Sequence, residues 1–170
     1  MSEPLVEENG APAGPLTRAN AQIHEAHDEA LLVVIEQLTS LEIDAARAGF
    51  RQLHDDMAEH LRREEAEGHR RYALLGDHPR GAGPELFEAD HVSQDKVTAT
   101  CLDAIERLDV TSTALRRQGV LALPLFYRLR NVLEHHTLRE QRFLYPRLDE
   151  VLGEEAASAM ATSLISPGGS

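Results

Sequence analysis

The stretch over residues 43–64, IDAARAGFRQLHDDMAEHLRRE, gives the clearest indication of the fold. Its apolar residues recur at alternating spacings of three and four, which is the period of a helix that buries one face. Two polar residues continue the series in phase, so that it reads Ile43, Ala46, Phe50, Leu53, Met57, His60 and Glu64. The stretch therefore predicts an amphipathic helix whose buried face ends in an imidazole and a carboxylate.

Helical patterns also lie on both sides of this stretch. We expect a first helix over 17–39, a second from Ser40 as N-cap to about 75, a third over 85–117 and a fourth from Pro124 to about Pro146. Glycines and prolines over 76–84 separate the second helix from the third. A short helix over 148–165 follows. Because strand-like alternation is scarce, the sequence predicts an all-α fold, an antiparallel up-down four-helix bundle with a short extra C-terminal helix.

The chain of 170 residues is the right size for one domain. We expect a flexible N-terminal tail over 1–16, the four-helix bundle over 17–152, and a short helix followed by a flexible C-terminal tail over 153–170. Both ends are rich in glycine and proline and lack an apolar period. Chemistry is therefore expected inside the bundle.

The composition excludes some classes of partner and compartment. With 29 Asp and Glu against 17 Lys and Arg, the net charge is −12, which argues against binding to nucleic acid or to an anionic membrane surface. Apolar runs are short and no signal-peptide pattern is seen, so we expect a cytoplasmic protein. Cys101 is the single cysteine and is expected to be a small core residue. The oligomeric state is left open.

The nine histidines are the unusual feature of the composition. In the first helix His27 lies at the centre of the apolar face, and His24 lies about 50° to one side. His91 lies near the apolar face of the third helix, and His136 and Glu140 lie near the middle of that of the fourth. Buried imidazoles and carboxylates are costly without partners, so these groups must satisfy one another or hold a cation.

Two segments share the pattern His-x-x-x-Glu, namely His60-Leu-Arg-Arg-Glu64 and His136-Thr-Leu-Arg-Glu140. Residues four apart project from one helical face, so each pair can hold one cation or share a carboxylate between two. One such match is expected by chance in an acidic chain, but two matches in phase with the core are not. Imidazoles with carboxylates suit iron, manganese or zinc. The predicted metal ligands, with a metal-free polar core as the alternative, are His27, His60, Glu64, His91, His136 and Glu140.

The run from His136 through Glu140 to Leu144-Tyr145-Pro146 resembles the fourth helix of hemerythrin-like, or HHE cation-binding, domains. In that family a histidine is followed one turn later by an acidic residue and then by a Leu-aromatic-Pro ending. The resemblance covers about residues 19–152 and implies a di-iron centre that binds oxygen at an open position on one iron. It also implies four terminal histidine ligands and two bridging carboxylates, which here would be His27, His60, His91, His136, Glu64 and Glu140.

The chain departs from the pattern of the family's oxygen carriers at two positions. That pattern has a second histidine one turn after the first on the third helix, where this chain has Asp95. It also places the last carboxylate five residues after its histidine, whereas Glu140 follows His136 by four and His135 by five. Fewer imidazoles and the polar Gln94 and Thr98 in the same seam alter the redox properties of such a site. We therefore expect oxidation in air and reaction with peroxide, not reversible storage of oxygen.

Three functions are compatible with these features. The first is a hemerythrin-like, non-haem di-iron protein that binds or reacts with a small oxidant, namely dioxygen, peroxide or nitric oxide. The second is an iron-handling or redox- or oxygen-sensing module without turnover. The third is a structural bundle that takes up zinc adventitiously.

The remaining polar residues have less defined roles. His24 is expected at the surface or behind the ligands, although His24, Asp95 and His135 could each join the metal shell. Glu65 is expected to face solvent, with support of a ligand as the alternative. Surface positions are expected for His54, His69 and His78, and Tyr145 is expected to pack away from the seam.

Overall fold

The computed structural model describes residues 13–165, which are almost entirely helical. The long helices are α1 (Pro15–Thr39), α2 (Ile43–Arg63), α4 (Pro84–Glu106), α5 (Leu115–Arg139) and α6 (Tyr145–Ile165), and α3 (Arg70–Leu74) is short. Two π-helical turns, η1 (Glu64–His69) and η2 (Glu140–Leu144), follow α2 and α5. Residues 13–165 contain no β-strand, which confirms the all-α prediction. The tails predicted for 1–12 and 166–170 lie outside the described residues.

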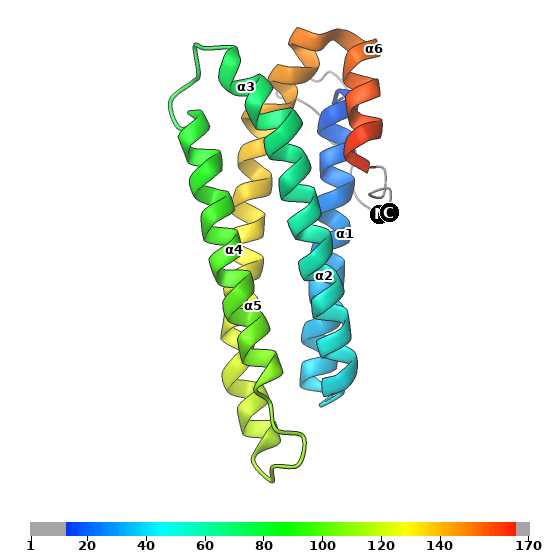
Figure 1. The fold of residues 1–170 in the computed structure, drawn as a ribbon, viewed down its shortest axis with the longest axis vertical. Helices are drawn as coiled ribbons and strands as arrows, with labels where there is room; N and C mark the ends of the chain where they lie inside the picture. The colour runs from blue at the N-terminus through cyan, green and yellow to red at the C-terminus, as the bar shows by residue number, and fades with distance from the viewer. Residues whose placement is uncertain (1–12, 166–170) are drawn as a thin grey trace.

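Four long helices, α1, α2, α4 and α5, lie side by side and form a helical bundle (Figure 1). Both α1 and α4 pack against α2 and α5, so the four helices enclose a common interior. At one end of the bundle, α6 lies against the first part of α1 (Figure 1). Within residues 13–165, every helix is too short or too polar to span a lipid bilayer.

Two apolar clusters fill the interior. The larger lies between the four long helices and contains Phe50 and Phe126, whose rings meet edge to face with centroids 5.2 Å apart. The smaller cluster lies at the α6 end and includes Leu16 of α1. Along α1, the buried residues of the smaller cluster end at Ala19 and those of the larger cluster begin at Leu31. The part of α1 between these two residues therefore lies between the two clusters. A layer of buried polar residues occupies this intermediate position.

The boundary between the third and fourth helices differs from the prediction. The third helix, α4, ends at Glu106 and not near residue 117. The Asp109 carboxylate stabilises the turn that follows, because it accepts hydrogen bonds from the backbone N–H and the hydroxyl of Thr111 at 2.9 and 2.7 Å. The next helix, α5, begins at Leu115 and continues through Pro124, which was expected to begin it.

The N-terminal boundary is also corrected. The predicted tail over 1–16 is wrong at its end, because α1 begins at Pro15 and Leu16 is fully buried. Asp149 of α6 explains this start: its carboxylate accepts hydrogen bonds from the backbone N–H groups of Leu16 and Thr17 at 2.9 and 3.0 Å. The Thr17 hydroxyl donates a third bond at 2.8 Å. Asp149 thus caps α1 from a distant part of the chain and joins it to α6, which Gly153 at φ 73° divides into two helical pieces.

Candidate metal centre

Six histidines and two glutamates gather in the polar layer between the two apolar clusters. They come from α1, α2, η1, α4, α5 and η2, and no residue of the set exposes more than 8% of its surface. We call this set the buried cluster; its members are His24, His27, His60, Glu64, His69, His91, His136 and Glu140.

The two glutamates form the middle of the buried cluster and are fully buried. Glu64 Oε1 lies 3.0 Å from His60 Nε2, and Glu64 Oε2 lies 3.6 Å from the Nε2 atoms of both His91 and His136. Glu140 contacts His136 as well, at 3.4 Å between Oε2 and Nε2. Each carboxylate is therefore approached by imidazoles from more than one helix.

Two groups within the buried cluster could hold a metal ion. In each group, one ligand atom per residue can be chosen so that all lie within 4.8 Å of one another. Both groups contain Glu64 and Glu140; the first adds His24 and His136, and the second adds His69 and His91. The two glutamates are thus common to both candidate positions.

Of the predicted ligands, the structure brings five together and places the sixth, His27, at the edge. The His27 ring centroid lies 5.5 Å from that of His60 and 6.1 Å from that of His24. His24, one turn earlier on α1, is buried and lies with its Nε2 3.0 Å from Glu140 Oε2. Of the two positions expected for it, at the surface or behind the ligands, the surface position is therefore wrong. The apolar residues that defined the face of α1 belong mainly to the larger cluster, whereas the first part of α1 is covered by α6 as well. The centre of the apolar face therefore does not point at the carboxylates.

His69 was expected at the surface and is buried instead. In an uninterrupted α-helix His69 would lie about 180° from His60, because nine residues each turn about 100°. The π-helical turn η1 accommodates roughly one extra residue, which brings the side chain back by about 100°. His69 Nε2 consequently lies 3.3 Å from Glu140 Oε1, and its ring centroid lies 4.4 Å from that of His91.

Tyr145 is turned inward for the same reason, and its predicted orientation away from the seam is wrong. It follows the π-helical turn η2, is fully buried, and its hydroxyl donates a hydrogen bond of 3.0 Å to Glu64 Oε1. Gly68 leaves room for this contact, because a Cβ there would lie 3.3 Å from the Tyr145 hydroxyl oxygen. Burial and the Glu64 carboxylate raise the pKa of Tyr145 well above its usual value.

The same spacing between a histidine and the side chain that its π turn brings inward occurs twice in the sequence. His69 lies nine residues after His60, and Tyr145 lies nine residues after His136, with a glutamate at the fourth position in each case. Each of these residues contacts the glutamate of the other segment. The repeated nine-residue spacing is therefore the signal that could have identified His69 and Tyr145.

The remaining candidates lie around or away from the buried cluster. Glu65 is exposed, yet its Oε1 lies 3.0 Å from His91 Nδ1, which matches the alternative that it supports a ligand. Asp95 and His135 are exposed and outside both ligand groups.

Gln94 and Thr98 are buried as expected, and Cys101 belongs to the larger apolar cluster. His54 and His78 are only half-buried, with His78 stacked on Tyr72 at 4.5 Å between centroids.

Within the buried cluster, the two carboxylates are balanced by protonated imidazoles. Burial alone would raise the pKa of both carboxyls, but the histidines hold the pKa of Glu64 well below its usual range and lower that of Glu140 to about 2. Burial alone would lower the pKa of His24 and His91, yet the carboxylates beside them raise both to about 9. The pKa of His27 is lowered to about 3 by burial and by the neighbouring histidines.

Several side-chain nitrogen and oxygen atoms of the buried cluster also lack a hydrogen-bond partner. Among the described residues these include Glu64 Oε2, His91 Nε2 and His136 Nε2. Buried polar atoms without partners are costly, and a metal ion would satisfy all of them together. The donor set of imidazoles and carboxylates suits a transition metal.

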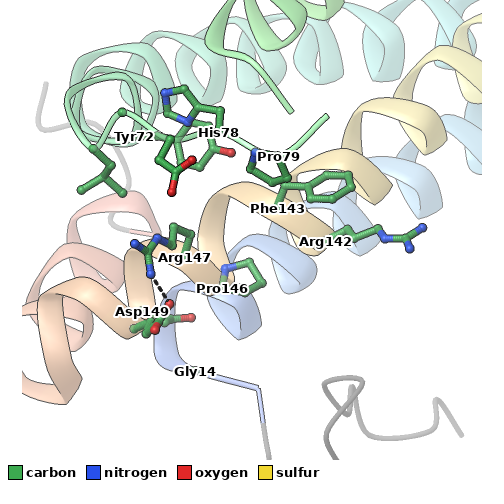
Figure 2. A pocket seen from close by; sticks show the side chains of 13 residues that line it. Gly14, Tyr72, His78, Pro79, Arg142, Phe143, Pro146, Arg147 and Asp149 are labelled. Atoms are coloured by element: carbon green, nitrogen blue, oxygen red, sulfur yellow. Dashed lines mark hydrogen bonds and ion pairs between the residues drawn. The ribbon is translucent and has the colours of Figure 1, made fainter. Parts of the chain in front are cut away.

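Two surface pockets reach the buried cluster. One, of about 630 Å³, lies between the α2–α3 segment and α4 and is lined by His69 and Glu65. The other, of about 400 Å³, lies between α1 and α5 and is lined by His24. A further pocket of about 630 Å³ at the α6 end has Tyr72 and His78 on one wall and Phe143 and Arg147 on the other (Figure 2). No residue of the buried cluster lines that end pocket.

Comparison with known proteins assigns no family to the chain. No family model, curated protein or solved structure matches it. Function is therefore inferred from the chemistry of the buried cluster.

Proposed function

We propose that this chain is a hemerythrin-like, non-haem di-iron protein that reacts with a small oxidant such as dioxygen, peroxide or nitric oxide. The observation that carries the proposal is the position of Glu64 and Glu140. Both are fully buried, and both belong to each of the two candidate ligand groups. Carboxylates shared between two positions are the usual way in which helix bundles hold a pair of metal ions.

The proposed fold is an antiparallel up-down four-helix bundle. Its support is that helices next to each other in the sequence pack together, α1 with α2 and α4 with α5. Short connections between packed neighbours favour this arrangement. One ion would be held by His24 and His136 and the other by His69 and His91, with Glu64 and Glu140 shared. His60, whose Nε2 lies 3.0 Å from Glu64 Oε1, would add a further imidazole on the His24 side.

This ligand set changes the comparison with the oxygen carriers. His69 would supply the imidazole that is missing at Asp95, since its ring lies beside that of His91. The number of imidazoles therefore no longer favours reaction with peroxide over reversible storage of oxygen. The remaining support is the polar surroundings, because Gln94 Oε1 and Thr98 Oγ1 are buried without a hydrogen-bond partner among the described residues. Such groups attract water, and a reversible carrier needs a dry pocket.

Residues outside the ligand set hold the ligands in place. The Tyr145 hydroxyl fixes one oxygen of Glu64, which leaves the other oxygen directed at His91 and His136. Glu65 accepts the Nδ1 proton of His91, so that Nε2 faces the buried carboxylates and would bind a metal ion once its own proton is displaced. When bound, the irons supply electrons that reduce the oxidant.

The test is reconstitution with ferrous iron under anaerobic conditions, followed by elemental analysis and absorption spectra before and after air. We expect about two irons per chain and a lasting ferric spectrum after air. His69→Ala should lower the iron content, whereas His135→Ala, which changes an exposed histidine, should not. One iron per chain would exclude the paired centre. A spectrum that reverses over repeated deoxygenation would indicate a carrier, and a colourless protein that takes only zinc would indicate the structural alternative.

A further inference from the structure

We propose that the pocket between the α2–α3 segment and α4 is the entrance by which small, polar, hydrogen-bonding molecules such as hydrogen peroxide reach the His69 side of the buried cluster. The pocket between α1 and α5, whose two sides an ion pair joins, contributes little to this traffic. This inference rests on the proposed metal centre, and it specifies the substrate class and the route that such a centre would use. We call the two the α2–α4 pocket and the α1–α5 pocket.

The α2–α4 pocket leads directly to a candidate ligand. His69 lines this pocket, and the same side chain lies with Nε2 3.3 Å from the fully buried Glu140. Two small residues, Ala66 and Ala73, line the pocket about one turn before and one turn after His69, and Pro84 lines its α4 side. His69 itself therefore joins this pocket to the buried carboxylates.

The lining of the α2–α4 pocket selects for polar molecules. Besides His69 it contains four charged residues, two of each sign, namely Arg62, Glu65, Arg70 and Glu88. A hydrogen-bonding solute can exchange its water for these groups at little cost, whereas an apolar gas gains nothing from them. Glu65 continues the polar lining inward, because its carboxylate contacts His91. The lining therefore suits peroxide better than dioxygen.

The α1–α5 pocket is bridged by an ion pair. His24 lies on its wall, but Arg130 of α5 donates two hydrogen bonds to the Asp28 carboxylate of α1, at 2.7 and 3.0 Å. Both residues line this pocket, so the pair joins its two sides. A molecule that passes between these two side chains has to separate a bidentate pair, which slows its entry.

The experiment measures how fast azide reaches the centre. The protein is loaded with cobalt(II), whose visible spectrum changes when azide binds, and association and dissociation rates are measured by stopped flow. Ala66→Trp narrows the α2–α4 pocket, and Ala21→Trp is the matched change in the α1–α5 pocket. Neither alanine is a proposed ligand.

A narrowed entrance slows arrival and departure equally. We therefore expect Ala66→Trp to lower both azide rates by at least about tenfold and to leave the dissociation constant unchanged. Ala21→Trp should change neither rate. Slower exchange in Ala21→Trp, unchanged rates in Ala66→Trp, or a changed dissociation constant with an unchanged dissociation rate would each overturn the proposal.

Two further measurements separate this proposal from its premise. If Ala66→Trp does not fold, Ala73→Trp narrows the same pocket from α3 and carries the same expectation. If the wild-type chain takes up no cobalt, the proposed metal centre fails. Access is then measured on the metal-free protein by the rate at which diethyl pyrocarbonate modifies His69 and His24. Slower labelling of His69 alone in Ala66→Trp supports the route, and equal labelling of His69 in both proteins rejects it.

Discussion

Glu140 links α1 to the rest of the buried cluster through two side chains. Its Oε2 atom lies 3.0 Å from His24 Nε2 and accepts a hydrogen bond of 3.1 Å from the Asn20 amide. His27 makes no such contact with either glutamate, although it is buried almost as completely. The choice between these two histidines therefore depends on the direction of the carboxylates and not on burial.

The first prediction distinguishes these two histidines. His24→Ala should disturb the spectrum and the affinity of a cobalt-loaded protein much more than His27→Ala, because only His24 belongs to a candidate ligand group. The loss expected from removing one of several ligands is about 10–100-fold in affinity or more. Competition with a chelator measures it. A larger effect from His27→Ala would show that metal binding rotates α1.

The second prediction concerns the Tyr145 hydroxyl. Tyr145→Phe leaves Glu64 Oε1 without this donor in a fully buried place, so the metal-free protein should lose about 1–3 kcal/mol of unfolding free energy. Urea denaturation measures the change. Tyr127→Phe is the control, because Tyr127 is half exposed and should cost little. Equal stabilities of wild type and Tyr145→Phe would mean that the hydrogen bond contributes nothing.

At the scale of elements, α1 depends on α6 for its first turn. The residue before α1, Gly14, has no side chain to cap the helix, and Asp149 takes that role. A carboxylate at this position also interacts favourably with the helix dipole.

The third prediction follows from this cap. Asp149→Ala should lower the unfolding free energy by about 1–2 kcal/mol, because backbone N–H groups of α1 lose their acceptor. The neighbouring Glu150→Ala removes only an exposed pair with Arg147 and should have little effect. Thermal unfolding of the two variants gives the comparison. A loss as large in Glu150→Ala would point to general charge effects.

The fourth prediction concerns the proline within α5. Pro124 is exposed and removes one backbone hydrogen bond from the helix, so Pro124→Ala should raise the unfolding free energy by about 1–3 kcal/mol. Pro84→Ala is the control, since a proline at the start of a helix leaves no bond unmade. Urea denaturation of both variants and of the wild type measures the change in unfolding free energy. A destabilised Pro124→Ala would indicate that the restriction which proline places on the unfolded chain outweighs the missing hydrogen bond.

For the whole molecule, the buried cluster makes folding depend on pH. The pKa values of His24 and His91 are raised from 6.5 to about 9, so between these values the folded state binds more protons than the unfolded state. Stability from these groups is complete below about pH 6.5 and is lost as the pH rises through about 9. A bound metal ion would take the place of these protons.

The fifth prediction is that metal abolishes this alkaline loss. Metal-free protein should lose a few kcal/mol of unfolding free energy between pH 6 and pH 9.5, and zinc-loaded protein should not. Urea unfolding at the two pH values, with and without zinc, measures the difference. If the metal-free protein is equally stable at both, the carboxylates do not need the imidazolium charges.

The sequence by itself determined the all-α class and the burial of the two His-x-x-x-Glu pairs. Within α2, from Ile43 to His60, and within α5, the helix period is uninterrupted, so spacing alone fixes which side chains share the buried face. His60, Glu64, His136 and Glu140 are buried for this local reason. No long-range contact was needed to predict their direction.

Only the tertiary structure decided the rest of the buried cluster. The π turns that turn His69 and Tyr145 inward have weaker local geometry than an α-helix, so they depend on contacts made elsewhere. His69 makes its contact with Glu140 and Tyr145 with Glu64, each at the start of the other π turn. The choice of His24 over His27 likewise follows from how α1 is covered by α6, which the sequence of α1 does not contain. Local spacing sets the phase of a regular helix, whereas its interruptions and its orientation are set by what packs against it.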